Sequence, residues 1–238
     1  MTRGDVMAVL IACEESQSVC TEFRAQGIET YSCDIIPCSG GHPEWHIQSD
    51  VIPLLNGDCS FTTSDGNTHI QIGQWDCIIA FPPCTYLSNA GACRLYPTKG
   101  NLDLERYAKG LEAKEFFMQF LNAKCEHIAV ENPVSSRVFN MPKHTQEIQP
   151  YQFDYDGIHP YTKKTRLWLK NLPPLIPTSP NAVPVGPYVP AGTSRKDRSK
   201  YGAAKRGDDA KNRAKFFTGF AKAMADQWGQ IIKQKTVG

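Results

Sequence analysis

Short apolar runs recur along this 238-residue chain, separated by longer stretches in which apolar and polar residues mix. Residues 6–12 are apolar throughout, which is typical of a strand buried on both faces of a parallel sheet. Residues 28–33, 75–80, 128–130 and 166–169 predict further strands. The pattern therefore predicts a largely buried sheet.

Helical periodicity occurs between these strands. Residues 16–26 place Val19 and Phe23 four apart and end before Gly27, which predicts a helix. Residues 102–120 carry apolar side chains near the helical period and predict a long amphipathic helix. A similar stripe from Phe216 to Ile231 predicts a terminal helix docked on the core.

The connecting segments differ in composition. Residues 37–45 are rich in turn formers, and residues 56–73 are polar and predict an inserted loop or hairpin. Residues 171–192 hold seven of the 17 prolines, so we expect an extended, stiff connection and no packed element there.

Strands that alternate with helices predict an α/β fold with a doubly wound, mostly parallel sheet. Ligands of such sheets bind at the carboxyl ends of the strands. Four polar residues fall at these ends: Asp34, Asp50, Cys84 and Glu131.

The composition is that of a soluble globular protein, with 41% hydrophobic and 21% charged residues. No apolar stretch approaches the roughly 20 residues that cross a bilayer, and the N-terminal residues lack a signal-peptide pattern. We therefore expect a cytoplasmic protein, a monomer with no membrane partner.

The nine cysteines are odd in number and irregularly spaced, which argues against a secreted disulfide framework. Cys33, Cys38, His42 and His46 could be read as a zinc site. Their spacing lacks the usual Cys-x-x-Cys, so we expect a turn-rich loop and no metal.

Positive charge is concentrated near the C-terminus. Residues 194–222 contain ten Lys or Arg and three Asp, a charge of +7, so the rest of the chain carries −5 of the total of +2. This asymmetry favours a segment that faces a polyanion, the alternative being a solvated loop without a partner.

Cys84 follows the proline pair Pro82-Pro83 at the end of an apolar run. Because the prolines fix two backbone angles, the thiol is presented from a rigid loop, as a nucleophile would be. Taken alone, it could equally be an unreactive turn cysteine.

A carboxyl group ends the run at 128–130, in Glu131-Asn132-Pro133. If burial raises its pKa, Glu131 can donate a hydrogen bond to a ring nitrogen. The alternative is a helix start, with Asn132 as N-cap and Pro133 as the first helical residue. A nucleophile at one strand end and a proton donor at another are the pair needed to attack an electron-poor ring.

With these motifs in this order, the chain resembles the cytosine-5 DNA methyltransferases, in particular their short phage-type members. The segment Pro82-Pro83-Cys84-Thr85-Tyr86-Leu87-Ser88 is similar to the nucleophile loop of that family, and Glu131-Asn132-Pro133 to its Glu-Asn-Val motif. Ser49-Asp50-Val51 is similar to its Gly-Asp-Ile motif. The resemblance runs from about residue 6 to residue 166 and resumes in the final helix.

The resemblance implies a Rossmann-like fold that uses S-adenosylmethionine to methylate C5 of a cytosine flipped out of duplex DNA. It implies that Cys84 adds to C6, that Glu131 hydrogen-bonds N3, and that Arg166 holds the base carbonyl or a nearby phosphate. The implied cofactor-binding positions are Cys13, Glu14, Asp34, Ile35, Asp50, Val51 and Pro82. The implied DNA-binding positions are Ser88, Lys164, Arg195, Lys196, Arg198, Lys205 and Arg206.

The chain departs from the family pattern in several places: Thr85 stands where the family has Gln, and Glu131 is followed by Asn-Pro and not by Asn-Val. Its first strand ends in Cys13-Glu14-Glu15 where the family has Phe-x-Gly-x-Gly, so Glu14 is expected to contact the amino group of the cofactor. The target-recognition region is reduced to residues 171–212, between a catalytic part, 1–170, and a helix in 213–238 that packs back on it. Phosphate contacts position but do not specify, so a short recognition sequence or a specificity partner is expected.

Two other classes of function stay open. An amino-methyltransferase acting on adenine N6 or cytosine N4 needs no thiol and places an aromatic residue directly after Pro-Pro, where this chain has Cys84. A non-catalytic nucleic-acid-binding relative would keep the fold without the activity. A variant that modifies RNA or a free nucleotide is a further alternative.

Overall fold

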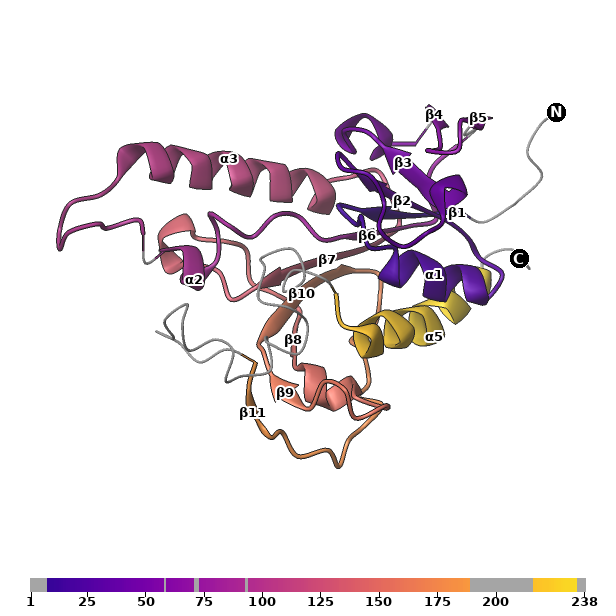
Figure 1. Ribbon diagram of the computed structural model, residues 1–238. Helices are drawn as coiled ribbons and strands as arrows, with labels where there is room; N and C mark the ends of the chain where they lie inside the picture. Colours follow the sequence, from indigo (N-terminus) through magenta and orange to yellow (C-terminus); the bar gives the residue numbers. More distant parts are fainter. Residues whose placement is uncertain (1–7, 58, 71–72, 93, 189–215, 235–238) are drawn as a thin grey trace.

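The computed structural model describes residues 8–57, 59–70, 73–92, 94–188 and 216–234 (Figure 1). Within them the chain builds a seven-stranded sheet. Its strands lie in the order β3 (His46–Gln48), β2 (Glu29–Asp34), β1 (Ala8–Ala12), β6 (Cys77–Ala80), β7 (His127–Pro133), β10 (Thr165–Lys170) and β8 (Gln146–Ile148). Strand β10 is antiparallel to both of its neighbours, and the other ladders are parallel. The predicted α/β class with a mostly parallel sheet is confirmed.

Helices cover both faces of the sheet. Helix α1 (Ser18–Ala25) and helix α5 (Thr218–Gln234) lie together on one face, and helix α3 (Leu104–Leu121) lies on the other (Figure 1). The buried residues of β1 alternate between the two cores, Val9 and Ile11 facing α1 and α5. Because both faces are covered, the central strands are apolar throughout, which is why the sequence reveals them.

Smaller elements occupy the edges of the sheet. The 56–73 segment forms the hairpin β4 (Ser60–Thr62) and β5 (Thr68–Ile70), as predicted. Strands β9 (Tyr161–Thr162) and β11 (Gly186–Pro187) form a short parallel pair. The remaining elements are α2 (Asn89–Ala92) and the 3-10 turns η1 (Pro43–Trp45), η2 (Ile52–Leu54), η3 (Arg137–Phe139) and η4 (Pro150–Phe153). No helix in the described part of the chain is long and apolar enough to cross a membrane.

The proline-rich connection packs more closely than its composition predicts. Leu172 and Leu175 are buried in the core on the α5 face. The indole of Trp228 in α5 donates to the carbonyl of Pro173 at 2.9 Å, and Gln227 bonds both backbone groups of Ile176. The expectation of an unpacked connection was wrong, because apolar residues between the prolines fill the space beside α5.

Candidate active site

The order of the strands sets the location of the candidate site. The chain continues from β1 to β2 on one side and returns to β6 on the other, so the strand order reverses between β1 and β6. Ligands of open α/β sheets bind outside the carboxyl ends of the strands at such a point. The loop that follows β6 carries Cys84, and β7 lies next to β6 in parallel with Ala80 opposite Val130. The register thus brings Cys84 and Glu131 to the same edge.

Asn132 connects these two strand ends. Its side chain is fully buried, and its Nδ2 donates to the carbonyl oxygen of Pro82 at 3.0 Å. Strand β7 continues through Pro133, so the alternative in which Asn132 caps a helix is wrong. The amide of Asn132 therefore fixes the nucleophile loop to the strand that carries Glu131.

Burial and charge set the protonation of the pair. Burial raises the pKa of Glu131 to about 7, and the nearby Lys163 opposes that rise. Burial raises the pKa of Cys84 as well; the charge of Glu131 adds to this rise, and the charge of Lys163 opposes it. The two groups are thus close enough to control each other, and at neutral pH Glu131 can hold a proton to donate.

The positive charge of Lys163 lowers the pKa of both Cys84 and Glu131, although this residue was not among the candidates from the sequence. It lies one residue before the selected Lys164, and its ammonium stands 5.0 Å over the ring of Phe217 and 5.7 Å over that of Tyr188. Lys163 precedes β10 in a connection outside any strand, so no periodic pattern in the sequence singles it out.

The structure does not bring Arg166 to the Cys84–Glu131 pair. In the β7–β10 ladder Leu167 lies opposite Glu131, while Arg166 lies opposite Asn132. Directly opposed residues share a face of the sheet, so the side chain of Arg166 lies on the other face from Glu131. There its Nε is 3.5 Å from the carboxylate of Glu147. The register thus places Arg166 on the opposite face of the sheet from Glu131, and its role in the catalytic group stays a prediction.

The nucleotide end of the predicted cofactor site is formed by β2 and β3. The amide of Ser49 donates to the carbonyl of Asp34 at 3.1 Å, which holds the two strand ends together. Ile35, which follows Asp34 at the end of β2, has a side chain that is 73% exposed. Two carboxylates with an exposed aliphatic side chain fit a ribose and a flat adenine ring. Val51, by contrast, is buried, so only its backbone can reach a ligand.

The carboxylate of Glu14 is already hydrogen-bonded to backbone amides of the protein. It is buried, and its two carboxylate oxygens accept hydrogen bonds from the amides of Val19 at 2.7 Å and Cys20 at 3.2 Å. These are first-turn amides of α1, which a helix leaves without backbone partners. Cys13 before it is left-handed, with φ 60°. Glu14 therefore closes the first loop by holding α1, and a contact to the cofactor's amino group would compete with these bonds.

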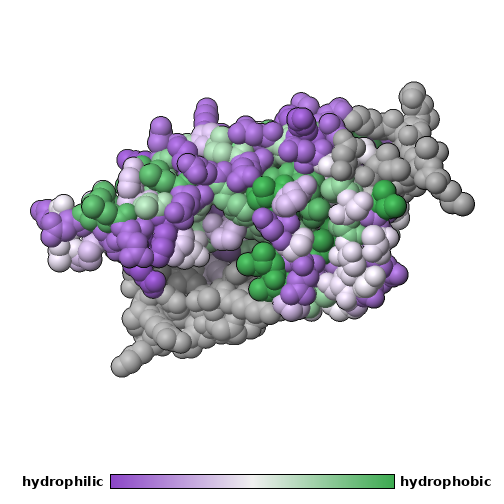
Figure 2. All heavy atoms as spheres, turned by 90° about the horizontal axis from the view of Figure 1, so that it is seen from above, coloured by the Kyte–Doolittle hydropathy of each residue, from purple (hydrophilic) through white to green (hydrophobic). Residues whose placement is uncertain are grey.

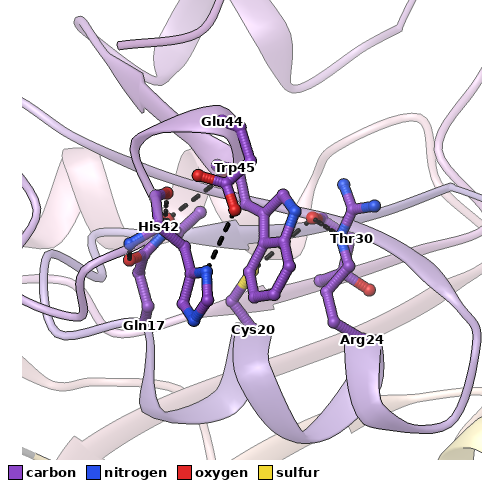
Figure 3. Close-up of polar contacts among 8 residues, drawn as sticks. Gln17, Cys20, Arg24, Thr30, His42, Glu44 and Trp45 are labelled. Carbon is purple, nitrogen blue, oxygen red and sulfur yellow. Dashed lines mark hydrogen bonds and ion pairs between the residues drawn. The ribbon is translucent and has the colours of Figure 1, made fainter. Parts of the chain in front are cut away.

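The segment 40–46 is a structural brace (Figure 3). The side chain of Gln17 bonds the carbonyl of His42 at 2.8 Å and its amide at 3.1 Å, and the rings of His42 and Trp45 stack at 3.8 Å. His46 is buried with its ring nitrogens 2.9 Å from Ser32 Oγ and 3.0 Å from the Ile36 carbonyl. These contacts pin the loop after β2, which carries Ile35, against the start of α1.

The remaining predicted positions are spread around this edge. Pro82 is buried, and Ser88 is buried with its hydroxyl accepting from the amide of Gly91. Lys164 is exposed and paired with Glu147 at 3.0 Å. The other five DNA-binding candidates lie outside the described residues: Arg195, Lys196, Arg198, Lys205 and Arg206.

Comparison with known proteins adds no identification. No protein-family model matches this chain, and no curated protein matches it either.

Proposed function

We propose that the chain is a DNA cytosine-5 methyltransferase that acts through a covalent bond between Cys84 and the target base. The observation that carries this proposal is the placement of Cys84 and Glu131 at the ends of adjacent parallel strands, where burial raises the pKa of both groups. A thiol nucleophile and a carboxyl group able to stay protonated near neutral pH fit attack on C6 with proton donation at N3. A mostly parallel sheet whose order reverses between β1 and β6 is compatible with a Rossmann-like methyltransferase.

Each residue of the group would have one task. The Cys84 thiolate adds to C6 while Glu131 gives its proton to N3, so no negative charge accumulates on the ring. Lys163 stabilises the thiolate before attack and again when it leaves. Asn132 keeps the nucleophile loop in register with Glu131 through its bond to Pro82. Once C5 has accepted the methyl group, the C5 proton is lost to solvent, Cys84 leaves as a thiolate and the N3 proton returns to Glu131, which restores the aromatic ring.

S-adenosylmethionine would supply an activated methyl group for C5. The residues at the ends of β2 and β3 fit its nucleoside half: Asp34 for the ribose hydroxyls, the exposed Ile35 for the adenine face, and Asp50 for the adenine amino group. The buried Glu14 would act indirectly, by fixing the loop that turns from β1 into α1.

Mass spectrometry of nucleosides tests the proposal. Methyl-free duplex DNA is incubated with the protein and S-adenosylmethionine, and then digested. We expect 5-methylcytosine with the wild type and none with Cys84→Ala, which should still bind DNA. N6-methyladenine or N4-methylcytosine would make the chain an amino-methyltransferase. Retained 5-methylcytosine in Cys84→Ala would end the covalent mechanism, and no modified base from the wild type would end the proposed activity.

A further inference from the structure

A basic cavity lies beside the nucleophile loop on the α3 face of the sheet. It has a volume of about 280 Å³ and is lined by the loop after β7, by η3 and by the start of β10. Since one water molecule occupies about 30 Å³ of liquid, the cavity has room for a phosphate group with bound water. Its charged lining residues are Arg137, Lys143 and Arg166.

The charges around this cavity do not cancel. None of the residues that line it is acidic. Glu147 next to it pairs with both Lys164 and Arg166. Counting these two cations with Arg137 and Lys143 gives four positive charges against one negative, a net charge of +3.

Arg137 and Lys143 are the uncompensated cations. Both are exposed, and within the described part of the chain neither side chain forms a hydrogen bond or an ion pair. The cavity also lowers the pKa of His144, through burial and through the charges of Arg166 and Lys143, with Glu147 opposing. The imidazole therefore stays neutral and can still donate one hydrogen bond. Five guanidinium donors and an ammonium group around a small cavity are suited to an oxyanion.

The cavity shares its wall with the loop that carries Cys84. Ser135, which lines the cavity, forms a β-bridge with Ser88, and the amide of Ser136 donates to the carbonyl of Leu87 at 2.7 Å. The amide of Asn89 donates to the carbonyl of Val134 at 2.9 Å. An anion in the cavity would therefore sit against the back of the nucleophile loop, a few residues from the thiol.

We propose that this cavity binds one backbone phosphate of the nucleic acid next to the target nucleotide, with Arg137 and Lys143 as the charged contacts. The inference rests on the proposed function and adds to it a phosphate site on described residues. Arg166 then contacts the nucleic-acid backbone from the face of the sheet opposite to Glu131. A phosphate held behind the nucleophile loop would fix the strand while the base rotates out of the helix, without reading its sequence.

The salt dependence of DNA binding tests the site independently of methyl transfer. Binding of a labelled 20-bp duplex is measured on a Cys84→Ala background over a salt series. The variant Arg137→Gln/Lys143→Gln should bind about tenfold more weakly, with a log–log salt slope shallower by about 1, as expected when one phosphate contact is lost. Arg137→Lys, which keeps the charge, should retain the slope of its parent.

The matched control removes the same charge elsewhere. Lys124 and Lys170 are exposed and lie at the other end of the β7–β10 ladder, so Lys124→Gln/Lys170→Gln should keep the parent slope. In a second measurement, single phosphates around the cytosine that the wild type methylates are replaced with neutral methylphosphonates. At one position, the methylphosphonate should weaken DNA binding by the parent and should not weaken binding by the cavity variant any further.

The outcomes separate the two proposals. If the wild type methylates cytosine but the cavity variant matches the control in slope, the phosphate site is overturned alone. The phosphate site is also overturned if every methylphosphonate lowers the DNA affinity of the variant as much as that of the parent. If the wild type does not methylate duplex DNA and the Cys84→Ala parent does not bind it, the proposed function fails, and the phosphate site fails with it.

Discussion

At the residue scale, burial and neighbouring charges set the protonation of Cys84 and Glu131. Burial disfavours charge on both groups, and the charge of Glu131 further disfavours the thiolate of Cys84. Lys163 opposes both effects. A proton on Glu131 therefore favours the thiolate, so the group is most nucleophilic in the state in which it can also donate a proton.

This coupling predicts the reactivity of the thiol. Glu131→Gln removes the negative charge that raises the pKa of Cys84, so the pH profile of its alkylation should move to lower pH. Lys163→Met should move the profile to higher pH. The measurement is the rate of iodoacetamide labelling of the Cys84 peptide by mass spectrometry. Glu131→Gln should nevertheless abolish methylation, and an unchanged profile in both variants would show that the three groups do not interact.

The pKa of Glu131 also predicts a pH-dependent stability. The folded state raises it from 4.5 to about 7, so the folded protein binds more protons than the unfolded chain between these values. Stability should therefore fall as pH rises through that range. At pH 8 Glu131→Gln should stabilise the protein by roughly 1–3 kcal/mol, and at pH 4.5 the gain should be largely lost.

Urea denaturation at the two pH values checks this. Glu112→Gln, at an exposed position on α3, is the control and should change stability little at either pH. A Glu131→Gln variant that is less stable than the wild type at pH 8 would show that the buried charge of Glu131 does not destabilise the fold.

At the element scale, the loop between β7 and β8 is positioned by helix α3. Gly110 of α3 is buried against the ring of Phe139 in η3, and a Cβ placed on it would lie 2.1 Å from that ring. Tyr107, one turn earlier, stacks on the same ring at 5.9 Å. The helix and the turn therefore meet at a point with no space for a side chain, and this contact fixes the wall of the basic cavity.

Gly110→Ala tests this contact. Alanine favours a helix over glycine by about 1 kcal/mol, yet the clash with Phe139 should make the variant less stable by about 1–3 kcal/mol. Thermal unfolding by circular dichroism measures the change. The second substitution Phe139→Leu should return part of the loss when made together with Gly110→Ala. A more stable Gly110→Ala protein would mean that helix propensity outweighs the contact.

At the scale of the whole molecule, the positive charge is concentrated in one segment near the C-terminus, and the rest of the chain is acidic. Residues 194–222 carry +7 and the remainder −5, and most of that segment lies outside the described residues. Figure 2 shows hydrophilic side chains spread over the α3 face, with apolar side chains between them. The cavity beside η3 adds a local positive site to the acidic remainder.

The basic segment makes its own prediction. Neutralising Arg195, Lys196, Arg198, Lys205 and Arg206 together should weaken DNA binding to all sequences alike and flatten its salt dependence. The slope should fall by more than in the cavity variant, because more cations are removed. Binding of two unrelated duplexes over a salt series measures both effects, and an unchanged slope would exclude this segment as a phosphate contact.

The apolar pattern along the chain was enough to locate the central strands and to select Cys84 and Glu131. Strands buried on both faces are apolar throughout, so β1 and β6 could be located, and the order of strands and helices predicts a mostly parallel sheet. Cys84 and Glu131 follow such strands directly. Because parallel strands end at one edge, their approach could be predicted once the fold class was known.

The cation near this pair and the contacts of the neighbouring groups, in contrast, follow from how the chain packs. A shift of one residue in strand register exchanges the faces of a sheet, and sequence does not give the register of β7 against β10. The register puts Arg166 opposite Asn132, on the far face from Glu131, and Lys163 acts on the pair instead. Likewise, the bonds of Glu14 to the amides of α1 and of Asn132 to Pro82 join groups that only packing brings within reach.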